Sequence, residues 1–232
     1  MQNKRSKRYQ QAAKLVEEKK LYSLEEAIKI LKTFPAAKFD ESVTLAFKLT
    51  VDPKQSDQMV RGTVALPHGS GKNVKILVFA KGKAADAARS AGAEHVGFED
   101  MIKKCQEGFQ DFDVAVATPE AMQEVRKLGK VLGPRGLMPN PKTGTVTDDT
   151  AKAVKECKAG RVEFKIDKAA NLHVLLGKRS FSDTQLIENI RAVIDSVVKA
   201  RPSSAKGHYI DRAVISSTQS PGLTLDMSEF KN

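Results

Sequence analysis

The chain has few of the residues that mark several protein classes. Its 232 residues include no tryptophan, two cysteines and four histidines, 6% are aromatic, and no apolar run is long enough to cross a membrane. The thiols of Cys105 and Cys157 lie far apart in sequence, which predicts reduced cysteines rather than a disulfide framework. The basic start MQNKRSKRYQQ has no apolar segment behind it, so we expect no secretory signal and a cytoplasmic chain without membrane contact.

Recognisable metal-binding and catalytic patterns are also missing. No pair of Cys or His residues has the spacing of metal ligands, and the four histidines are scattered: His68, His95, His173 and His208. The carboxylates of Asp148 and Asp149 precede a predicted helix, where we expect them to cap its N-terminus. No serine or cysteine lies in a nucleophile motif. The sequence therefore predicts no catalytic residue, no metal and no cofactor.

Two glycine-rich basic segments raise the possibility of a nucleotide site. In KLGKVLGPRGLMPNPKTGTV, residues 127–146, Lys142 and Thr143 follow Pro141, which has no N–H to offer a phosphate. In GSGKN, residues 69–73, Asn73 stands where a magnesium-binding hydroxyl belongs. A nucleotide-using enzyme built on the central part of the chain is therefore the disfavoured alternative.

Positive charge is what the chain has in excess. Lys and Arg number 39 against 28 Asp and Glu, which gives a net charge of +11 and an isoelectric point of about 9.6. Such an excess favours a polyanionic partner. A membrane surface is less favoured, since no basic amphipathic helix with bulky aromatics is evident. A basic protein that is merely soluble remains an alternative at this point.

The hydrophobic pattern differs between the two ends of the chain and its middle. Both ends read as α+β, with strict alternation at residues 43–51 and a capped amphipathic helix at 182–202. The terminal elements predicted are helices at 8–20, 22–35 and 182–202 and strands at 43–51, 62–66, 161–166, 171–177 and 212–217. The middle alternates buried strands at 74–80 and 113–118 with helices at 82–92, 119–129 and 147–160.

These patterns predict an α+β domain built from both termini, residues 1–67 and 160–232, and an inserted Rossmann-like α/β domain with a mainly parallel sheet, residues 68–159. We expect a hinge at Pro67, His68 and Gly69 and at Gly160. The two-ended domain carries a net charge of +8 and the insert +3, so the main contact with a polyanion is expected on the former.

Several segments of the two-ended domain suit nucleic acid. They are the basic N-terminus, AKFDES at residues 37–42, GKRSF at 177–181 and SSTQSPG at 216–222. Small residues and hydroxyls let an RNA backbone approach and can meet 2′-hydroxyl groups. Each segment alone is an ordinary loop, and their common occurrence favours RNA. DNA is the other possibility, but no helix-turn-helix is evident.

At this point several motifs resemble a known family, bacterial large-subunit ribosomal protein one. In chain order they are SDQMVRGTVALPHGSGK, AKGKA, DFDVAVATPEAM, LGPRGLMPNPKTGTV and KAGRVEFKID, and the resemblance covers nearly the whole chain. The resemblance implies a non-enzymatic part of the large (50S) subunit with the two-domain hinge fold. It also implies binding to 23S ribosomal RNA at the mobile stalk, release of deacylated tRNA from the exit site, and repression of the operon's own messenger RNA.

The resemblance also implies which residues contact RNA. They are Lys38, Phe39, Ser42, Lys178, Ser180, Thr218, Gln219 and Ser220, supported by the basic Arg5, Lys7, Arg8, Arg161 and Lys165. The family usually has threonine where Ser42 stands, and Thr-Met-Gly-Pro where this chain has residues 218–221. If the loop needs positive φ at Ser220, serine costs about 1 kcal/mol there. For residues 127–146 two roles stay open: contact with RNA or tRNA, or only the fixing of an irregular loop.

Overall fold

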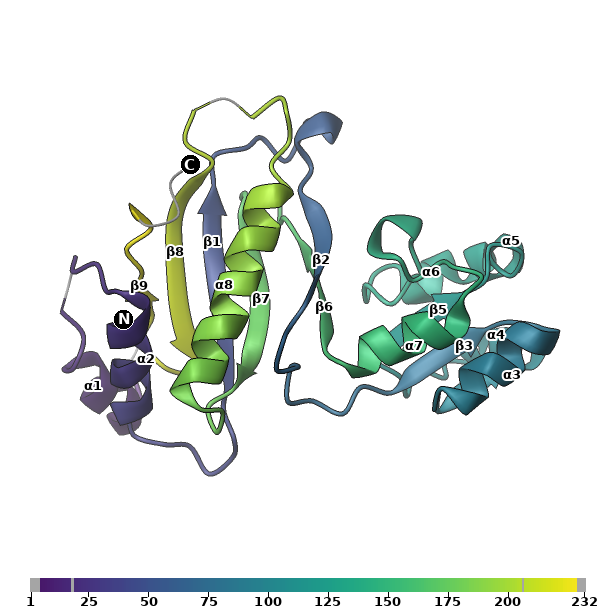
Figure 1. Ribbon diagram of the computed structural model, residues 1–232, viewed down its shortest axis with the longest axis horizontal. Coiled ribbons are helices and arrows are strands. Elements are labelled where there is room, and N and C mark those ends of the chain that lie inside the picture. The colour runs from purple at the N-terminus through teal and green to yellow at the C-terminus, as the bar shows by residue number, and fades with distance from the viewer. Residues whose placement is uncertain (1–4, 18, 206, 229–232) are drawn as a thin grey trace. The chain divides into compact units, whose positions relative to one another are not determined.

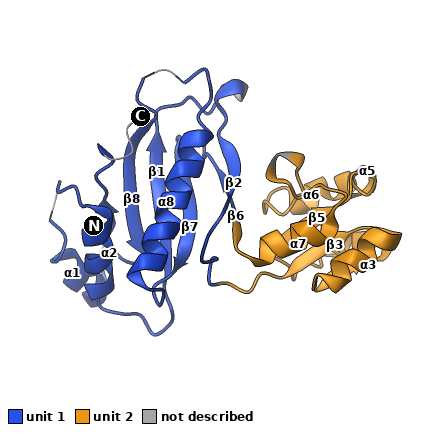
Figure 2. Ribbon diagram, in the orientation of Figure 1, with its two compact units in different colours: residues 1–71, 162–232 blue, residues 72–161 orange. Residues whose placement is uncertain are grey.

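The computed structural model describes residues 5–17, 19–205 and 207–228 (Figure 1). The chain forms two compact units (Figure 2). The first comprises Met1–Gly71 with Val162–Asn232, and the second comprises Lys72–Arg161. The first is called the two-ended unit below and the second the insert.

The two-ended unit is built on an antiparallel sheet with strand order β7-β1-β8-β9. The strands are β1 (Ser42–Leu49), β7 (Asn171–Lys178), β8 (Ile210–Ser217) and β9 (Leu223–Thr224). The alternation predicted for the first strand is confirmed, because Val43, Leu45, Phe47 and Leu49 are all buried while the residues between them are not. β1 is central, so its register with β7 and β8 decides which side chains become neighbours.

Two helices cover the buried face of this sheet. They are α2 (Leu24–Thr33) and α8 (Asp183–Lys199), and α8 crosses the sheet in Figure 1. The predicted capping box of α8 is confirmed: the Ser182 hydroxyl accepts from the Gln185 amide, and the Gln185 side chain accepts from the Ser182 amide. Its predicted apolar face is fully buried and comprises Leu186, Ile190, Val193, Ile194 and Val197.

A two-stranded sheet completes the two-ended unit. It pairs β2 (Arg61–Ala65) with β6 (Arg161–Lys165). Val64 and Phe164 carry its apolar side into the main core. Gly62 is required here, because a Cβ at that position would lie 2.7 Å from the Phe164 ring.

The insert has a parallel sheet of order β4-β3-β5, as the predicted mainly parallel sheet requires. The strands are β3 (Ile76–Phe79), β4 (His95–Gly97) and β5 (Val114–Ala117). Every residue of β3 is buried, because Ile76 and Val78 pack into one hydrophobic cluster while Leu77 and Phe79 pack into another. The helices of the insert are α3 (Gly82–Ser90), α4 (Glu99–Gln106), α5 (Met122–Val125), α6 (Gly129–Leu132) and α7 (Thr150–Lys158).

Two predicted helices differ from the observed ones. The helix expected at residues 8–20 is only α1 (Lys7–Ala13), because Lys19 takes a φ of 66° and the Tyr22 hydroxyl accepts from the Glu17 amide as the chain turns towards the sheet. Glu18, within that prediction, lies outside the described residues. The helix expected from Pro119 starts at Met122 and is divided by the 3₁₀ turn η2 (Arg126–Leu128). Further short 3₁₀ turns are η1 (Ser56–Gln58) and η3 (Pro141–Thr143).

Candidate nucleic-acid interface

Three loops that are far apart in sequence meet at one end of the main sheet. β1 starts where β7 and β8 end, so Ser42 lies opposite Lys178 and Val43 lies opposite Ser217. This register brings together residues 37–42, 178–181 and 217–220, called the loop cluster below. Each of these loops contains residues that the sequence predicted to contact RNA.

A buried carboxylate holds the loop cluster together. Glu41 is 1% exposed, and its Oε1 accepts from Arg8 Nη1 at 2.8 Å, Arg179 Nη1 at 3.2 Å and the Ala37 amide at 2.7 Å. Its Oε2 accepts from Ser217 Oγ at 2.5 Å. Burial by itself would raise the pKa of Glu41, but the Ser217 hydroxyl, the Ala37 amide and the two guanidinium groups outweigh it and lower the pKa. Glu41 is therefore ionised at neutral pH.

The second guanidinium ties the loop cluster to helix α2. Arg179 Nη2 donates to the Lys32 carbonyl at 2.8 Å and also to the Phe34 carbonyl. Its side chain is 14% exposed. Arg179 and Glu41 were not among the predicted site residues, although KFDES and GKRSF contain them. An acidic residue inside an otherwise basic segment is the signal in the sequence that points to such an anchor.

Ser42, Lys178 and Thr218 form direct contacts across the strand ends. Lys178 Nζ donates to Ser42 Oγ at 3.0 Å. The Ser42 amide donates to Thr218 Oγ1 at 3.0 Å, and the Thr218 amide donates to the Ser42 carbonyl at 3.0 Å. An ammonium group has three donors, so Lys178 keeps capacity for an anion. The three predicted residues thus lie within one hydrogen-bonded group.

The turn after β7 is fixed by Asp40. Its carboxylate accepts from the Ser180 amide at 3.2 Å and from Ser180 Oγ at 2.7 Å. The neighbouring Lys38 is exposed, and Phe39 is 53% exposed. An aromatic ring so exposed adds little to the core.

The turn after β8 differs from the expectation for Ser220. The residue with positive φ is Gln219, at 61°, so the conditional cost assigned to Ser220 was placed one residue too late. Ser220 Oγ accepts from the Ser217 amide at 2.9 Å and donates to the Pro221 carbonyl at 3.0 Å. Gln219 Oε1 accepts from Arg8 Nη2 at 2.9 Å. Serine at 220 therefore closes the turn, and glutamine at 219 bears its strain.

The supporting basic residues lie in different places. Arg8 contacts the loop cluster through Glu41 and Gln219, and Arg5 lies over the Tyr9 ring with its guanidinium carbon 4.9 Å from the ring centre. Lys7 is exposed on α1. Lys165 is exposed on β6, in the separate two-stranded sheet, and Arg161 belongs to the insert, where it pairs with Glu156 at 2.5 Å. Of these supporting residues, the structure therefore shows Arg8 in contact with the loop cluster.

The first predicted hinge segment, residues 67–69, is hydrogen-bonded to α8 within the two-ended unit. The buried Asn189 accepts from the His68 amide at 3.1 Å and donates to the carbonyls of Gly69 at 3.2 Å and Leu176 at 2.7 Å. His68 Nε2 lies 2.5 Å from Glu188 Oε2. Pro67 is exposed beside them, and Gly160 follows α7 with a φ of 101°.

The glycine-rich segment at residues 127–146 is folded against the insert. Leu132 is buried, and Leu137 and Met138 pack on the same hydrophobic cluster. Thr145 Oγ1 accepts from the Asn140 amide at 2.8 Å, and the Thr145 carbonyl accepts from the Ala117 amide at 2.9 Å. The segment thus extends the edge of the parallel sheet beside β5.

Comparison with known proteins decides the family. Residues 31–221 match the model of the ribosomal protein L1p/L10e family. The chain belongs to the ribosomal protein L1p/L10e family. The match spans far more than half of the 232 residues, and it confirms the resemblance that the sequence motifs carry.

Curated relatives of this L1p/L10e chain agree along nearly its full length. It is 53% identical over 227 residues to the large ribosomal subunit protein uL1 of Beutenbergia cavernae, covering 98% of this chain and 95% of the relative. It is also 53% identical over 223 residues to the proteins of that name from Lactobacillus delbrueckii subsp. bulgaricus and Kosmotoga olearia, covering 96% of each chain. The family is structural and non-enzymatic, which leaves the nucleotide-using alternative without support.

Two properties of the described residues bear on other site types. Within residues 5–17, 19–205 and 207–228, no helix combines the length and apolar character needed to cross a membrane. Over the same ranges, no group of three or more His, Cys, Asp or Glu side chains is arranged to hold a metal ion.

The thiols of Cys105 and Cys157 are buried, and burial raises the pKa of each.

Proposed function

We propose that this L1p/L10e protein is a cytoplasmic constituent of the large ribosomal subunit and binds 23S ribosomal RNA at the mobile stalk through its loop cluster. The observation that carries the proposal is the convergence of three loops on buried Glu41. Long-range hydrogen bonds fix these loops before RNA arrives, so little ordering entropy is lost on binding. The relatives named large ribosomal subunit protein uL1 support the same assignment.

The proposed contacts fall into two groups. Lys38, Phe39 and Lys178 meet RNA directly, with the cations on phosphates and the ring against a base or ribose. Ser42, Ser180, Thr218, Gln219 and Ser220 line the same surface while their side chains fix the loops. The hydroxyls retain acceptor or donor capacity for 2′-hydroxyl groups, since each can take part in more than one hydrogen bond.

Finer roles follow from the same recognition. A messenger RNA from its own operon that copies the stalk structure would occupy the same loop cluster, so translation would be repressed when ribosomal RNA is saturated. We further propose that the two chain crossings between the units act as the hinge, and that the stalk assists release of deacylated tRNA from the exit site. These roles rest on the family resemblance together with the loop cluster.

The proposal is tested by replacing the exposed ring. Phe39→Ala should weaken binding to a stalk RNA fragment about ten- to hundredfold, because stacking on a base contributes about 1–3 kcal/mol. Leu21→Ala is the matched control, since Leu21 is 58% exposed but lies outside the loop cluster. Fluorescence anisotropy gives both dissociation constants, and thermal melting checks that both variants fold. Equal affinities for Phe39→Ala, Leu21→Ala and the unaltered protein would refute the role of the cluster.

A further inference from the structure

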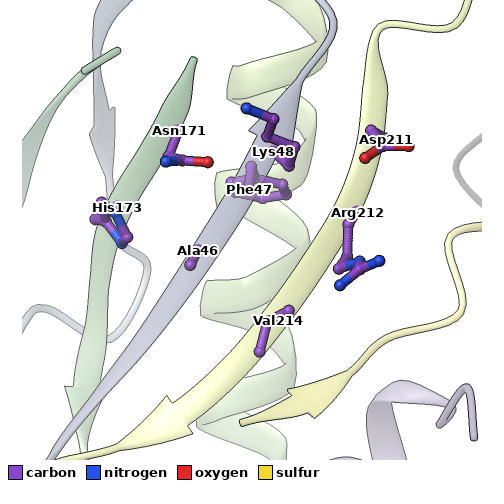
Figure 3. A pocket seen from close by; sticks show the side chains of 8 residues that line it. All are labelled: Ala46, Phe47, Lys48, Asn171, His173, Asp211, Arg212 and Val214. Atoms are coloured by element: carbon purple, nitrogen blue, oxygen red, sulfur yellow. The ribbon is translucent and has the colours of Figure 1, made fainter. Parts of the chain in front are cut away.

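The sheet face turned away from α8 carries a hollow at the far end from the loop cluster (Figure 3). Its volume is about 410 Å³. In Figure 3 α8 lies behind the three strands, so the hollow opens on the uncovered side. Its lining comes from β1, β7 and β8: Ala46, Phe47, Lys48, Asn171, His173, Asp211, Arg212 and Val214.

Strand register explains why a hollow forms here. Ala46 lies between His173 and Val214, and in the next row Lys48 lies between Asn171 and Arg212. Neighbouring strands are about 4.8 Å apart, so the side chains flanking Ala46 are separated by roughly 10 Å. Because the Ala46 side chain is a single methyl group, the surface is depressed between His173 and Val214. Ala46 is the apolar floor of this depression, and the next row, Asn171, Lys48 and Arg212, is wholly polar.

The charges around the floor favour an anion. Lys48 and Arg212 are exposed on neighbouring strands, His173 is exposed on the third, and Asp211 is the one carboxylate in the lining. Lys48 Nζ donates to the Ala169 carbonyl, which leaves two further donors. Arg212 presents a planar guanidinium. Asn171 Nδ2 donates to Asp167 Oδ2 at 3.3 Å, so the amide keeps its oxygen and one further N–H for a ligand. This set suits a phosphate together with the hydrogen-bonding edge of a base.

The hollow and the loop cluster lie on the same three strands, β1, β7 and β8. Lys48 is six positions after Ser42 along β1, a distance of about 20 Å. Between them Thr44 Oγ1 lies 3.3 Å from Ser216 Oγ on the same face. The hydroxyls of Thr44 and Ser216, beside Leu175, therefore lie between the two regions on one face of the sheet.

We propose that the hollow is a second RNA subsite, which takes an unpaired nucleotide of the RNA bound at the loop cluster; this rests on the proposed function. The phosphate lies on Lys48 and Arg212, and the base lies over Ala46 between His173 and Val214. The His173 imidazole stacks against the base in place of the aromatic rings that many RNA-binding sheets use. The subsite thus extends recognition from the loops across the sheet.

The first test measures salt dependence on the full-length protein. Lys48→Gln with Arg212→Gln should reduce the slope of log affinity against log salt concentration by about 1.4, the value for two phosphate contacts to a single strand. The matched control is Lys29→Gln with Arg191→Gln, which removes the same charge from exposed positions on α2 and α8. Equal slopes for the two double variants would overturn the proposal and would leave the hollow to another partner, such as an acidic protein segment.

A second test locates the RNA directly. Ala46→Cys can be labelled with a photoreactive reagent at that position alone, because Cys105 and Cys157 are buried thiols with raised pKa values. Illumination should crosslink the label to an unpaired nucleotide of the stalk RNA, whereas Lys29→Cys carrying the same label should not. Crosslinking no stronger than that control would contradict the subsite.

These tests separate the subsite from the proposed function itself. If the unaltered protein binds stalk RNA no better than a scrambled RNA, the proposed function fails and the subsite fails with it. If the unaltered protein prefers stalk RNA and Phe39→Ala weakens it, but the hollow variants behave as their controls do, only the subsite is wrong.

Discussion

At the scale of single residues, Glu41 is the residue of the site that holds the most partners in place. It joins Arg8, Arg179, Ser217 and the Ala37 amide, residues up to 176 positions away in sequence. Removing one partner of a buried ion pair leaves the other charges uncompensated, which is more costly than removing an exposed pair. The positions of the side chains that would face RNA therefore depend on Glu41, which is too buried to contact RNA itself.

Glu41→Gln should lower the free energy of unfolding by about 1–3 kcal/mol at neutral pH, because a charge-assisted network becomes a neutral one. The pKa of Glu41 is lowered in the folded protein, so its stabilisation is fully present above the unfolded-state value of about 4.3 and is lost as the pH falls through the folded value. Denaturant unfolding between pH 7 and pH 3 should show the gap between the two proteins closing at acid pH. A gap that stays constant over this range would show that the ionised carboxylate is not the anchor.

The turn after β8 offers a second prediction, with opposite signs at adjacent positions. Gln219→Gly should stabilise the protein by up to about 1 kcal/mol, because glycine accepts the positive φ without strain. Ser220→Ala should destabilise it by about 1 kcal/mol, because the Ser217 amide loses its acceptor. Thermal melting of both variants tests the assignment, and the reverse order of stabilities would mean that Ser220 bears the strain.

At the scale of elements, sequence patterns predicted the long helices and strands whose signals lie within one continuous segment. The alternation in β1 and the capping box of α8 each lie within one continuous segment, so both could be predicted without the rest of the chain. β4 has three residues, all partly exposed, so it shows no alternation, and α4 starts without a side-chain cap, so no capping residue marks its beginning. In the shortened α1, the turn closed by the Tyr22 hydroxyl on the Glu17 amide overrides helix propensity.

The same limit applies to the loop cluster. Its candidate residues followed from motifs and the family resemblance, but their partners did not. Arg179 and Glu41 lie 138 positions apart and meet only because β1 is the central strand between β7 and β8. Positive φ at Gln219 is likewise set by how the turn closes after β8, whereas the family's glycine suggested it one residue later, at Ser220.

Helix α8 provides the prediction at this scale. Asn189→Ala should lower the free energy of unfolding by about 2–4 kcal/mol, because the His68 amide and the Gly69 and Leu176 carbonyls lose a buried partner. The adjacent control, Glu188→Ala, removes only an exposed contact with His68 and should cost less than about 1 kcal/mol. Urea unfolding compares the two, and similar losses for both variants would rule out Asn189 as the attachment of residues 68–69.

At the scale of the whole molecule, one chain forms a unit from its two ends and another from its middle. The sequence indicated this organisation because the hydrophobic pattern changes from alternating to continuous strands and back. All the residues of the loop cluster, and all those of the hollow, belong to the two-ended unit. That unit also carries most of the net positive charge. RNA recognition should therefore not require the insert.

The most direct test joins residues 1–71 to 162–232 through a short Gly-Ser linker and measures its dissociation constant for stalk RNA beside that of the intact chain and of residues 72–161 alone. The joined unit should fold with a cooperative melt and bind within about tenfold of the intact chain, with an affinity that falls steeply as salt rises. The insert alone should not distinguish stalk RNA from scrambled RNA. A folded two-ended unit without that preference, beside an insert that has it, would contradict the account.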